Sequence, residues 1–138
     1  MRAALVALVL PLSAVATPGA LRAQSSALSA PSDVVLRQLA AFRADDWDAA
    51  YALASQSIRA LFDRTAFENM VRSGYPEIAR STEVAVTDGE EAPDGSIYLT
   101  VIVRGASGRA VEAMYEMVRE DEGWRVNGVV TRPLASSV

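Results

Sequence analysis

The chain of 138 residues has the length of one domain, and its 17 acidic residues outnumber its 13 basic residues, for a net charge of −4. It contains no histidine, no cysteine and no lysine, since every basic residue is an arginine. These absences exclude Ser-His-Asp and Cys-His triads, Schiff-base lysines, P-loops, histidine-ligated metal sites and disulfides. Any catalysis has to rest on Asp, Glu, Tyr, Arg or Ser.

Residues 1–23 have the order of a secretory signal peptide. Arg2 supplies the positive start, residues 3–12 are apolar, and small residues follow as far as Ala23. Small residues suit signal-peptidase cleavage after Ala16 or after Ala23. The apolar run is interrupted by Pro11 and is shorter than the roughly 20 residues that span a bilayer, which favours export over an uncleaved anchor. We therefore expect a periplasmic or secreted protein with no stable membrane span after cleavage.

Cleavage after Ala23 would make the chain more acidic. The loss of Arg2 and Arg22 leaves 11 basic residues against 17 acidic ones, a net charge of −6. A surface this acidic argues against a nucleic-acid partner, which needs a basic footprint. We expect residues 24–32 to be a flexible Ser- and Ala-rich lead-in, residues 33–134 to form a single domain, and residues 135–138 to be a tail.

Helical periodicity runs through the first half of the predicted domain. Ser32 is expected to cap a helix whose apolar stripe is Val35, Leu39 and Phe42. Asp45 or Asp46 is expected to cap a second helix. Apolar residues at steps of three and four predict its buried stripe, with a break at residues 55–57; the stripe is Trp47, Tyr51, Ala54, Ile58 and Leu61.

A third helix is predicted from a capping box. Thr65 and Glu68 have the spacing at which the two side chains satisfy exposed N–H groups reciprocally. Phe67, Met70 and Val71 lie on one side of this helix. It is expected to end at Gly74 in a left-handed cap, and Pro76 prevents its resumption.

Beyond Pro76 the apolar period changes from 3.6 to 2, which predicts strands. Alternating segments occur around residues 84–86, 96–104, 109–119 and 124–130, and turn residues separate them. The second half is therefore predicted to be an antiparallel meander.

The pattern also predicts the strand register. Apolar faces match when Leu99 lies opposite Tyr115 and Val101 opposite Ala113, which requires a five-residue loop or a bulge around Arg109. In the last hairpin, Met117 is expected opposite Trp124 and Tyr115 opposite Val126. One face of the sheet should then receive the helices; its apolar residues are Leu99, Val101, Tyr115, Met117, Trp124 and Val126.

Three segments carry a family resemblance: residues 38–55 (QLAAFRADDWDAAYALAS), 67–76 (FENMVRSGYP) and 112–129 (EAMYEMVREDEGWRVNGV). They resemble an exported bacterial family catalogued as domain of unknown function 4864, over about residues 34–131. The element order is similar to the nuclear transport factor 2-like superfamily, which includes SnoaL-type and ketosteroid-isomerase-type domains. The resemblance implies an α+β fold in which three N-terminal helices pack on a curved, cone-like four-stranded antiparallel meander.

The same resemblance implies a pocket, because superfamily members commonly hold one between the helices and the concave face of the sheet. Aromatic side chains are the candidates for its lining: Trp47, Tyr51, Phe67, Tyr75, Tyr115 and Trp124. The functional interpretation is an apolar pocket for a small ligand. The alternative is that these side chains fill the core and their polar tips find local partners. Tyr51, Tyr75 and Tyr115 are the stronger pocket candidates, because a hydroxyl can orient a ligand.

The acidic residues are interpreted as caps and solvated faces. The Asp45–Asp48 cluster suits a helix N-terminus, and Glu112 and Glu116 suit the solvent side of a sheet. We therefore expect no metal, no cofactor and no assigned catalytic residue.

Two functional hypotheses remain. The first is a non-enzymatic binding or interaction module, whose partner is a small apolar ligand or a protein, with a homodimer through the sheet as one form. The alternative is a small cofactor-free isomerase or hydrolase that uses a buried carboxylate and a tyrosine. Asp63 and Glu68 are the first carboxylate candidates.

Overall fold

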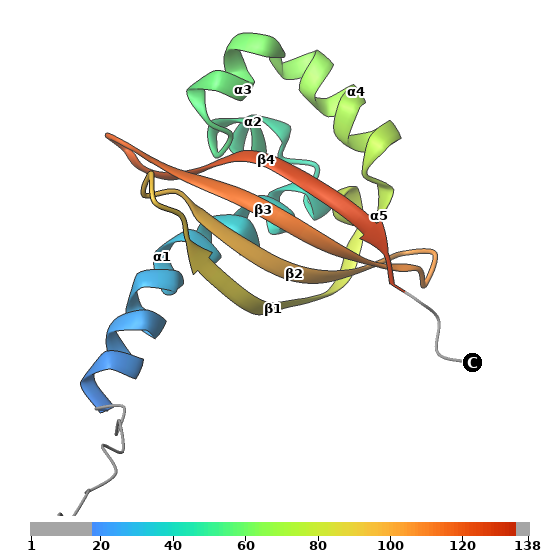
Figure 1. The fold of residues 1–138 in the computed structure, drawn as a ribbon. Coiled ribbons are helices and arrows are strands. Elements are labelled where there is room, and N and C mark those ends of the chain that lie inside the picture. The colour runs from blue at the N-terminus through green and yellow to red at the C-terminus, as the bar shows by residue number, and fades with distance from the viewer. Residues whose placement is uncertain (1–17, 135–138) are drawn as a thin grey trace, which may run out of the picture.

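The computed structural model describes residues 18–134, in which five helices precede a four-stranded sheet. The elements are α1 (Pro18–Arg43), α2 (Trp47–Ala52), α3 (Gln56–Leu61), α4 (Arg64–Gly74), α5 (Pro76–Ala79), β1 (Ser81–Glu91), β2 (Ile97–Gly105), β3 (Ala110–Glu120) and β4 (Gly123–Pro133). The sheet is antiparallel and its strands lie in chain order (Figure 1). The predicted α+β class and four-stranded meander are confirmed, whereas the described residues hold five helices where three were expected.

The helix α1 is much longer than predicted. Residues 24–32, expected to be a flexible lead-in, belong to the helix, and Pro31 within it is buried. The side chain of Leu28 packs on β1, 2.7 Å from the point that a Cβ would occupy on Gly89. Alanine is the best helix former, and docking on the sheet offsets the cost of the proline. Ser32 is therefore an interior residue and not a cap.

The predicted signal peptide falls mostly outside the described residues. Residues 1–17, with the candidate cleavage site after Ala16, are not described, whereas Ala23 lies within α1. Figure 1 shows the first part of α1 projecting past β1, away from the rest of the domain. Within residues 18–134, no helix is long and apolar enough to cross a membrane.

Asp45 makes the sharp turn between α1 and α2. Its φ of 54° lies in the left-handed region, which aspartate adopts more readily than most residues. Its carboxylate accepts hydrogen bonds from Arg80 at 2.6 Å and from Arg72 at 3.3 Å. Arg80 also donates to the carbonyl oxygen of Phe42, near the end of α1, at 3.2 Å. The turn is thus held by charge-assisted hydrogen bonds from two arginines.

Short polar side chains begin the next three helices. Asp46 accepts from the N–H of Ala49, Ser55 from that of Ile58, and Asp63 from that of Ala66. The predicted cap at Asp46 and the predicted break at residues 55–57 are confirmed. The predicted capping box is wrong, because Asp63 takes the cap position and Thr65 lies inside the first turn of α4. The left-handed cap at Gly74 is also wrong, since Gly74 is the last helical residue and has no positive φ.

The chain between α2 and α3 is hydrogen-bonded directly to β4. The N–H of Ser55 donates to the carbonyl of Val126, and the N–H of Val126 donates to the carbonyl of Leu53, both at 2.9 Å. These two bonds make a parallel bridge centred on Ala54. The hydroxyl of Ser55 also lies 2.7 Å from the side-chain oxygen of Asn127. We call this contact the Ser55–Val126 bridge.

The first register prediction is confirmed, and the second is wrong. Leu99 pairs with Tyr115 and Val101 with Ala113, and five residues, 105–109, lie between the paired residues Arg104 and Ala110. In the last hairpin, Met117 pairs with Val126, because Glu120 pairs with Gly123 across a two-residue turn, which moves the partner two residues from the predicted one. Tyr115 pairs with Val129, because β4 also carries an extra residue, Asn127, at a bulge. The bulge lies at the Ser55–Val126 bridge, a contact that strand periodicity does not encode.

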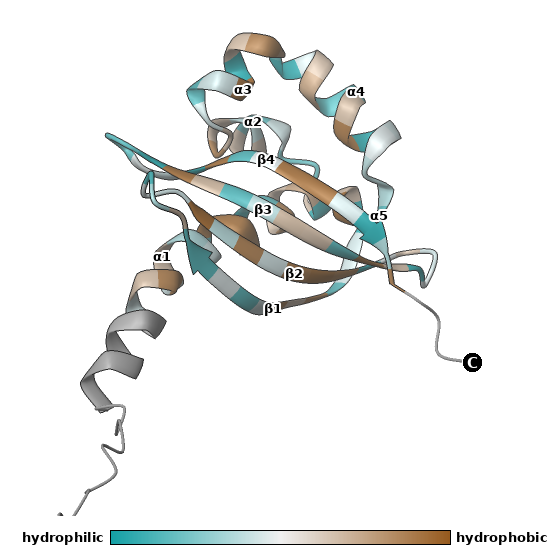
Figure 2. Cartoon of the chain, in the orientation of Figure 1, coloured by the Kyte–Doolittle hydropathy of each residue, from teal (hydrophilic) through white to brown (hydrophobic). Residues whose placement is uncertain are grey.

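The inner face of the sheet and the helices share one core. Of the six residues predicted for this face, Leu99, Val101, Tyr115, Met117 and Val126 are buried, whereas Trp124 is partly exposed. The stripe of α1 is buried as predicted. Leu61 is 75% exposed, against prediction, because α3 ends there and Phe62 packs inward in its place. Figure 2 shows hydrophilic residues at the tips of the β1–β2 and β3–β4 hairpins.

The Asp45 turn predicts a pH-dependent stability. The hydrogen bond from Arg80, with attraction from Arg80 and Arg72, lowers the pKa of Asp45 below 3.8. A carboxyl group with a lowered folded pKa stabilises the fold above its unfolded pKa, and that contribution disappears as pH falls through the folded pKa. Asp45→Asn should therefore lower the Tm at neutral pH, and its difference from wild type should shrink below pH 3.8.

The control for this prediction is Asp121→Asn, which removes the same charge from the β3–β4 turn. Thermal unfolding followed by circular dichroism over a pH series compares the three proteins. A difference between Asp45→Asn and wild type that stays constant into the acid range would contradict this account of the turn.

Candidate functional site

An apolar cavity of about 280 Å³ lies between the helices α3 and α4 and the inner face of β3 and β4. Its walls are predominantly aliphatic and aromatic side chains. Ile58, Phe62 and Met70 line it and are partly exposed, whereas Phe67 and Tyr115 line it and are buried. Small-molecule sites in proteins usually have about 300–1,000 Å³, so this cavity of about 280 Å³ lies just below that range and suits a small ligand.

Local tethers hold the helices that cover the cavity. The Ser55–Val126 bridge fixes the start of α3 against β4. The hydroxyl of Tyr51 lies 2.6 Å from the carbonyl oxygen of Phe62 and 3.1 Å from that of Arg59, which fixes the end of α3 to α2. Because both ends of this short helix are held by hydrogen bonds, it cannot settle freely onto the sheet.

Tyr115 forms part of the cavity wall and has an unusual hydroxyl. The side chain comes from the middle of β3 and is 1% exposed. Its hydroxyl has no hydrogen-bond partner among the described residues, whereas buried polar atoms are nearly always paired. Burial raises the pKa of Tyr115 far above its ordinary value, and the nearby Tyr75 adds to the effect. The group therefore stays protonated and remains a hydrogen-bond donor at every physiological pH.

The other polar side chains of the lining are already engaged. Gln38, which is buried, donates its amide N–H to the carbonyl oxygen of Ala50 at 3.1 Å. The hydroxyl of Tyr75 donates to the carbonyl oxygen of Val129 at 3.4 Å, a long and weak hydrogen bond. No charged side chain lines this cavity in the part of the chain that is described.

The six predicted pocket residues divide into three groups. Phe67, Tyr75 and Tyr115 line the cavity. Trp47 and Tyr51 lie in the core behind it. Trp47 packs on Phe42 at a ring-centroid distance of 5.1 Å, and the guanidinium of Arg72 lies 4.7 Å from its ring. Trp124 lies at a different hollow.

Other residues of the lining, Phe62, Met70 and Val129, were not among the predicted ones. Met70 shared the apolar side of the third predicted helix, so its periodicity placed it near the sheet. Phe62 falls outside every predicted stripe, because it follows the end of α3. Val129 faces the cavity only because of the bulge at Asn127. The sequence therefore held a signal for Met70 and none for the other two.

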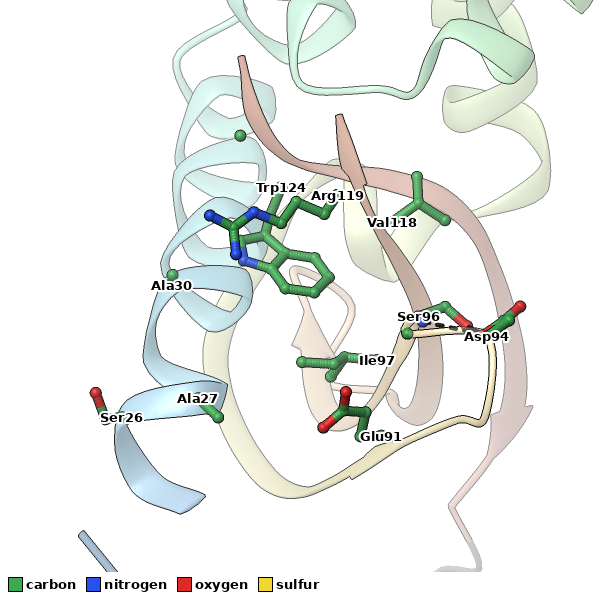
Figure 3. Close-up of a pocket in the computed structure, with 12 residues that line it drawn as sticks. Ser26, Ala27, Ala30, Glu91, Asp94, Ser96, Ile97, Val118, Arg119 and Trp124 are labelled. Atoms are coloured by element: carbon green, nitrogen blue, oxygen red, sulfur yellow. Dashed lines mark hydrogen bonds between the residues drawn. The ribbon is translucent and has the colours of Figure 1, made fainter. Parts of the chain in front are cut away.

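The second hollow is a groove of about 720 Å³ between α1 and the tips of the β1–β2 and β3–β4 hairpins. Figure 3 shows Arg119 beside the indole of Trp124, facing the small side chains of Ala27 and Ala30. Asp94 accepts hydrogen bonds from the N–H and the hydroxyl of Ser96, which lower its pKa. None of the buried polar atoms that lack a partner in the described residues belongs to this groove. It gives no comparable indication of a ligand.

The candidate carboxylates of the enzyme hypothesis lie away from the apolar cavity. Asp63 caps α4, and Glu68 accepts hydrogen bonds from Arg64 at 3.0 Å and from Arg72 at 2.8 Å. Glu112 pairs with Arg132. No aspartate or glutamate lines the cavity among residues 18–134, and that part of the chain holds no acidic cluster suited to a metal ion.

The fold and the cavity define a class of protein, a small α+β domain whose short helices cover one face of an open antiparallel meander and leave an apolar cavity there. The chain belongs to the family described as domain of unknown function 4864, whose sequence model matches residues 25–137. The predicted membership of this family is thereby confirmed. No curated protein and no solved structure matches the chain.

The unpartnered hydroxyl predicts that Tyr115→Phe will stabilise the protein. A buried hydroxyl without a partner costs about 1–3 kcal/mol, and phenylalanine removes the hydroxyl without changing the ring. The free energy of unfolding, measured by urea titration, should therefore rise. Tyr51→Phe is the matched comparison, because the Tyr51 hydroxyl has carbonyl partners. It should lower the free energy of unfolding by about 1 kcal/mol. Equal losses in both variants would show that Tyr115 has a partner after all.

Proposed function

We propose that this protein is an exported, non-enzymatic module that binds a small apolar ligand in the cavity between α3, α4 and β4. One observation carries the proposal. The cavity is lined almost wholly by apolar side chains, and one of its lining residues, Tyr115, has a buried hydroxyl without a partner among the described residues. An apolar hollow with one or a few polar groups is the usual form of a small-molecule site.

The chemistry of the lining favours binding over catalysis. General acid–base catalysis needs a group that exchanges a proton near the operating pH. The raised pKa of Tyr115 makes it a fixed donor, and the acids first considered, Asp63 and Glu68, cap a helix and pair with arginines. No specific observation favours the isomerase or hydrolase alternative.

A variant in which a larger side chain fills the cavity tests the proposal directly. Val129 lines the cavity, whereas its neighbour Val130 is 74% exposed and lies on the opposite face of β4. Toluene, a small neutral hydrocarbon, should raise the Tm of wild type and of Val130→Phe. It should bind Val129→Phe at least about tenfold more weakly, since the larger ring occupies the cavity.

Heteronuclear NMR titration gives the affinities and locates the shifts. Shifts around Phe67 and Tyr115 are expected for wild type and for Val130→Phe. Toluene that binds Val129→Phe as tightly as wild type, or that leaves wild type unshifted, would overturn the cavity as the binding site.

Export is proposed on the order of residues 1–23, a positive start, an apolar run and small residues. Cleavage after Ala16 or Ala23 would leave Leu28, the first residue whose packing on the sheet is described, in the mature chain. Mass spectrometry of periplasmic protein should find Thr17 or Gln24 at the N-terminus. An intact Met1 would contradict export by cleavage.

The finer assignment to the nuclear transport factor 2-like superfamily, with its cone-like sheet, is also a proposal. It is supported by the order of helices before a meander and by a cavity on the helix-facing side of the sheet. A homodimer through the other face of the sheet, where Met114 and Tyr98 are partly exposed, stays a prediction.

A further inference from the structure

One residue of the cavity lining, Tyr115, has a buried hydroxyl for which the described residues hold no hydrogen-bond partner. We infer that the ligand is uncharged and carries a hydrogen-bond acceptor, such as a carbonyl or ether oxygen, on an otherwise apolar body, and that this oxygen accepts from Tyr115. The inference rests on the proposed function and narrows it to a class of ligand. It concerns binding alone and involves no chemical step.

The surroundings of the cavity disfavour a charged ligand. The lining holds no charged side chain among the described residues, so a buried carboxylate or ammonium would lose its hydration without compensation. The arginines of the covering helices do not line the cavity. Arg64 and Arg72 pair with Glu68 at 3.0 and 2.8 Å. Arg59 lies 3.9 Å from Glu120, and its buried Nε has no partner among the described residues.

Tyr115 is the donor that a ligand can engage without loss to the protein. The amide of Gln38 donates to the carbonyl of Ala50, and the hydroxyl of Tyr75 donates to that of Val129, although at 3.4 Å. Redirecting either donor would leave a backbone carbonyl with one bond fewer. The hydroxyl of Tyr115 gives up no described protein bond, and its raised pKa keeps the proton in place. Because Tyr115 is buried, the ligand's oxygen must reach the innermost part of the cavity.

Hydrogen bonding sets the expected selectivity. A hydrocarbon that enters the cavity leaves the Tyr115 hydroxyl unpaired, whereas an oxygen-bearing ligand of the same shape pairs it. A neutral hydrogen bond in a protein is worth a factor of about three to ten in an equilibrium constant. The preference for the oxygen-bearing ligand should therefore change by about this factor when the hydroxyl is removed.

Acetophenone and α-methylstyrene form the test pair, because a carbonyl oxygen in the first takes the place of a methylene group in the second. Dissociation constants from NMR titration give the ratio of the two affinities in each protein. In Tyr115→Phe the ratio should move towards α-methylstyrene by about threefold to tenfold. Tyr98→Phe, which removes a phenol hydroxyl from the outer face of β2, should leave the ratio unchanged. Circular dichroism confirms that both variants are folded.

The outcomes separate the two proposals. If both compounds bind and the ratio is the same in Tyr115→Phe as in wild type, the ligand class is wrong and the cavity remains a binding site. If neither compound nor toluene binds wild type, the proposed function fails and the inference fails with it. Benzoate serves as the anion of similar size, and binding as tight as that of acetophenone would also overturn the inference.

Discussion

The Ser55–Val126 bridge is the contact on which the rest of the arrangement depends. Two backbone hydrogen bonds of 2.9 Å join the chain between α2 and α3 to β4, and they do so where Asn127 interrupts the pairing of β4 with β3. Backbone hydrogen bonds have a narrow range of length, so this bridge fixes the chain between α2 and α3 beside the edge strand β4. The bulge in turn directs Val129 towards the helices. One local irregularity thus positions both a wall and the cover of the cavity.

A second anchor lies at the other side of the helical layer. The carboxylate of Asp45 contacts Arg80 and Arg72, and the guanidinium of Arg72 lies over Trp47. These side chains are partly exposed, so their ion pairs contribute little energy by themselves. Their effect is geometric, because they hold the left-handed turn that sends α2 across the core. With the helices held at both sides, α3 and α4 cover the sheet without filling the space beneath them.

Local chemistry was readable from the sequence, and contacts between layers were not. The cap at Asp46 and the pairing of Leu99 with Tyr115 follow from short-range patterns, and the structure has both. The two-residue turn of the last hairpin gives Met117 a partner other than the predicted one. The bulge at Asn127, which contacts Ser55, 72 residues away in the chain, moves the partner of Tyr115 by one residue more. The Ser- and Ala-rich start of α1 is compatible with a coil or a helix, and packing of Leu28 on the sheet decides in favour of the helix.

In the candidate site, too, the sequence predicted the region but not the contacts that the fold creates. Aromatic residues marked the right region, since Phe67, Tyr75 and Tyr115 line one cavity. Nothing in the sequence distinguished them from Trp47 and Tyr51, which are core residues, because an inward-facing aromatic has the same periodicity in either role. The sequence also could not show that the Tyr115 hydroxyl lacks a hydrogen-bond partner, because this depends on which groups the surrounding elements place near it.

The central claim is that the space between the helices and β4 is a cavity that accepts an apolar guest. Diffraction from crystals of the mature protein pressurised with xenon tests it most directly, since xenon enters dry apolar cavities. The account predicts a xenon atom bounded by Phe67, Tyr115 and Val129. Crystals in which Met70 and Phe62 close over the sheet, with no xenon between α4 and β4, would contradict it.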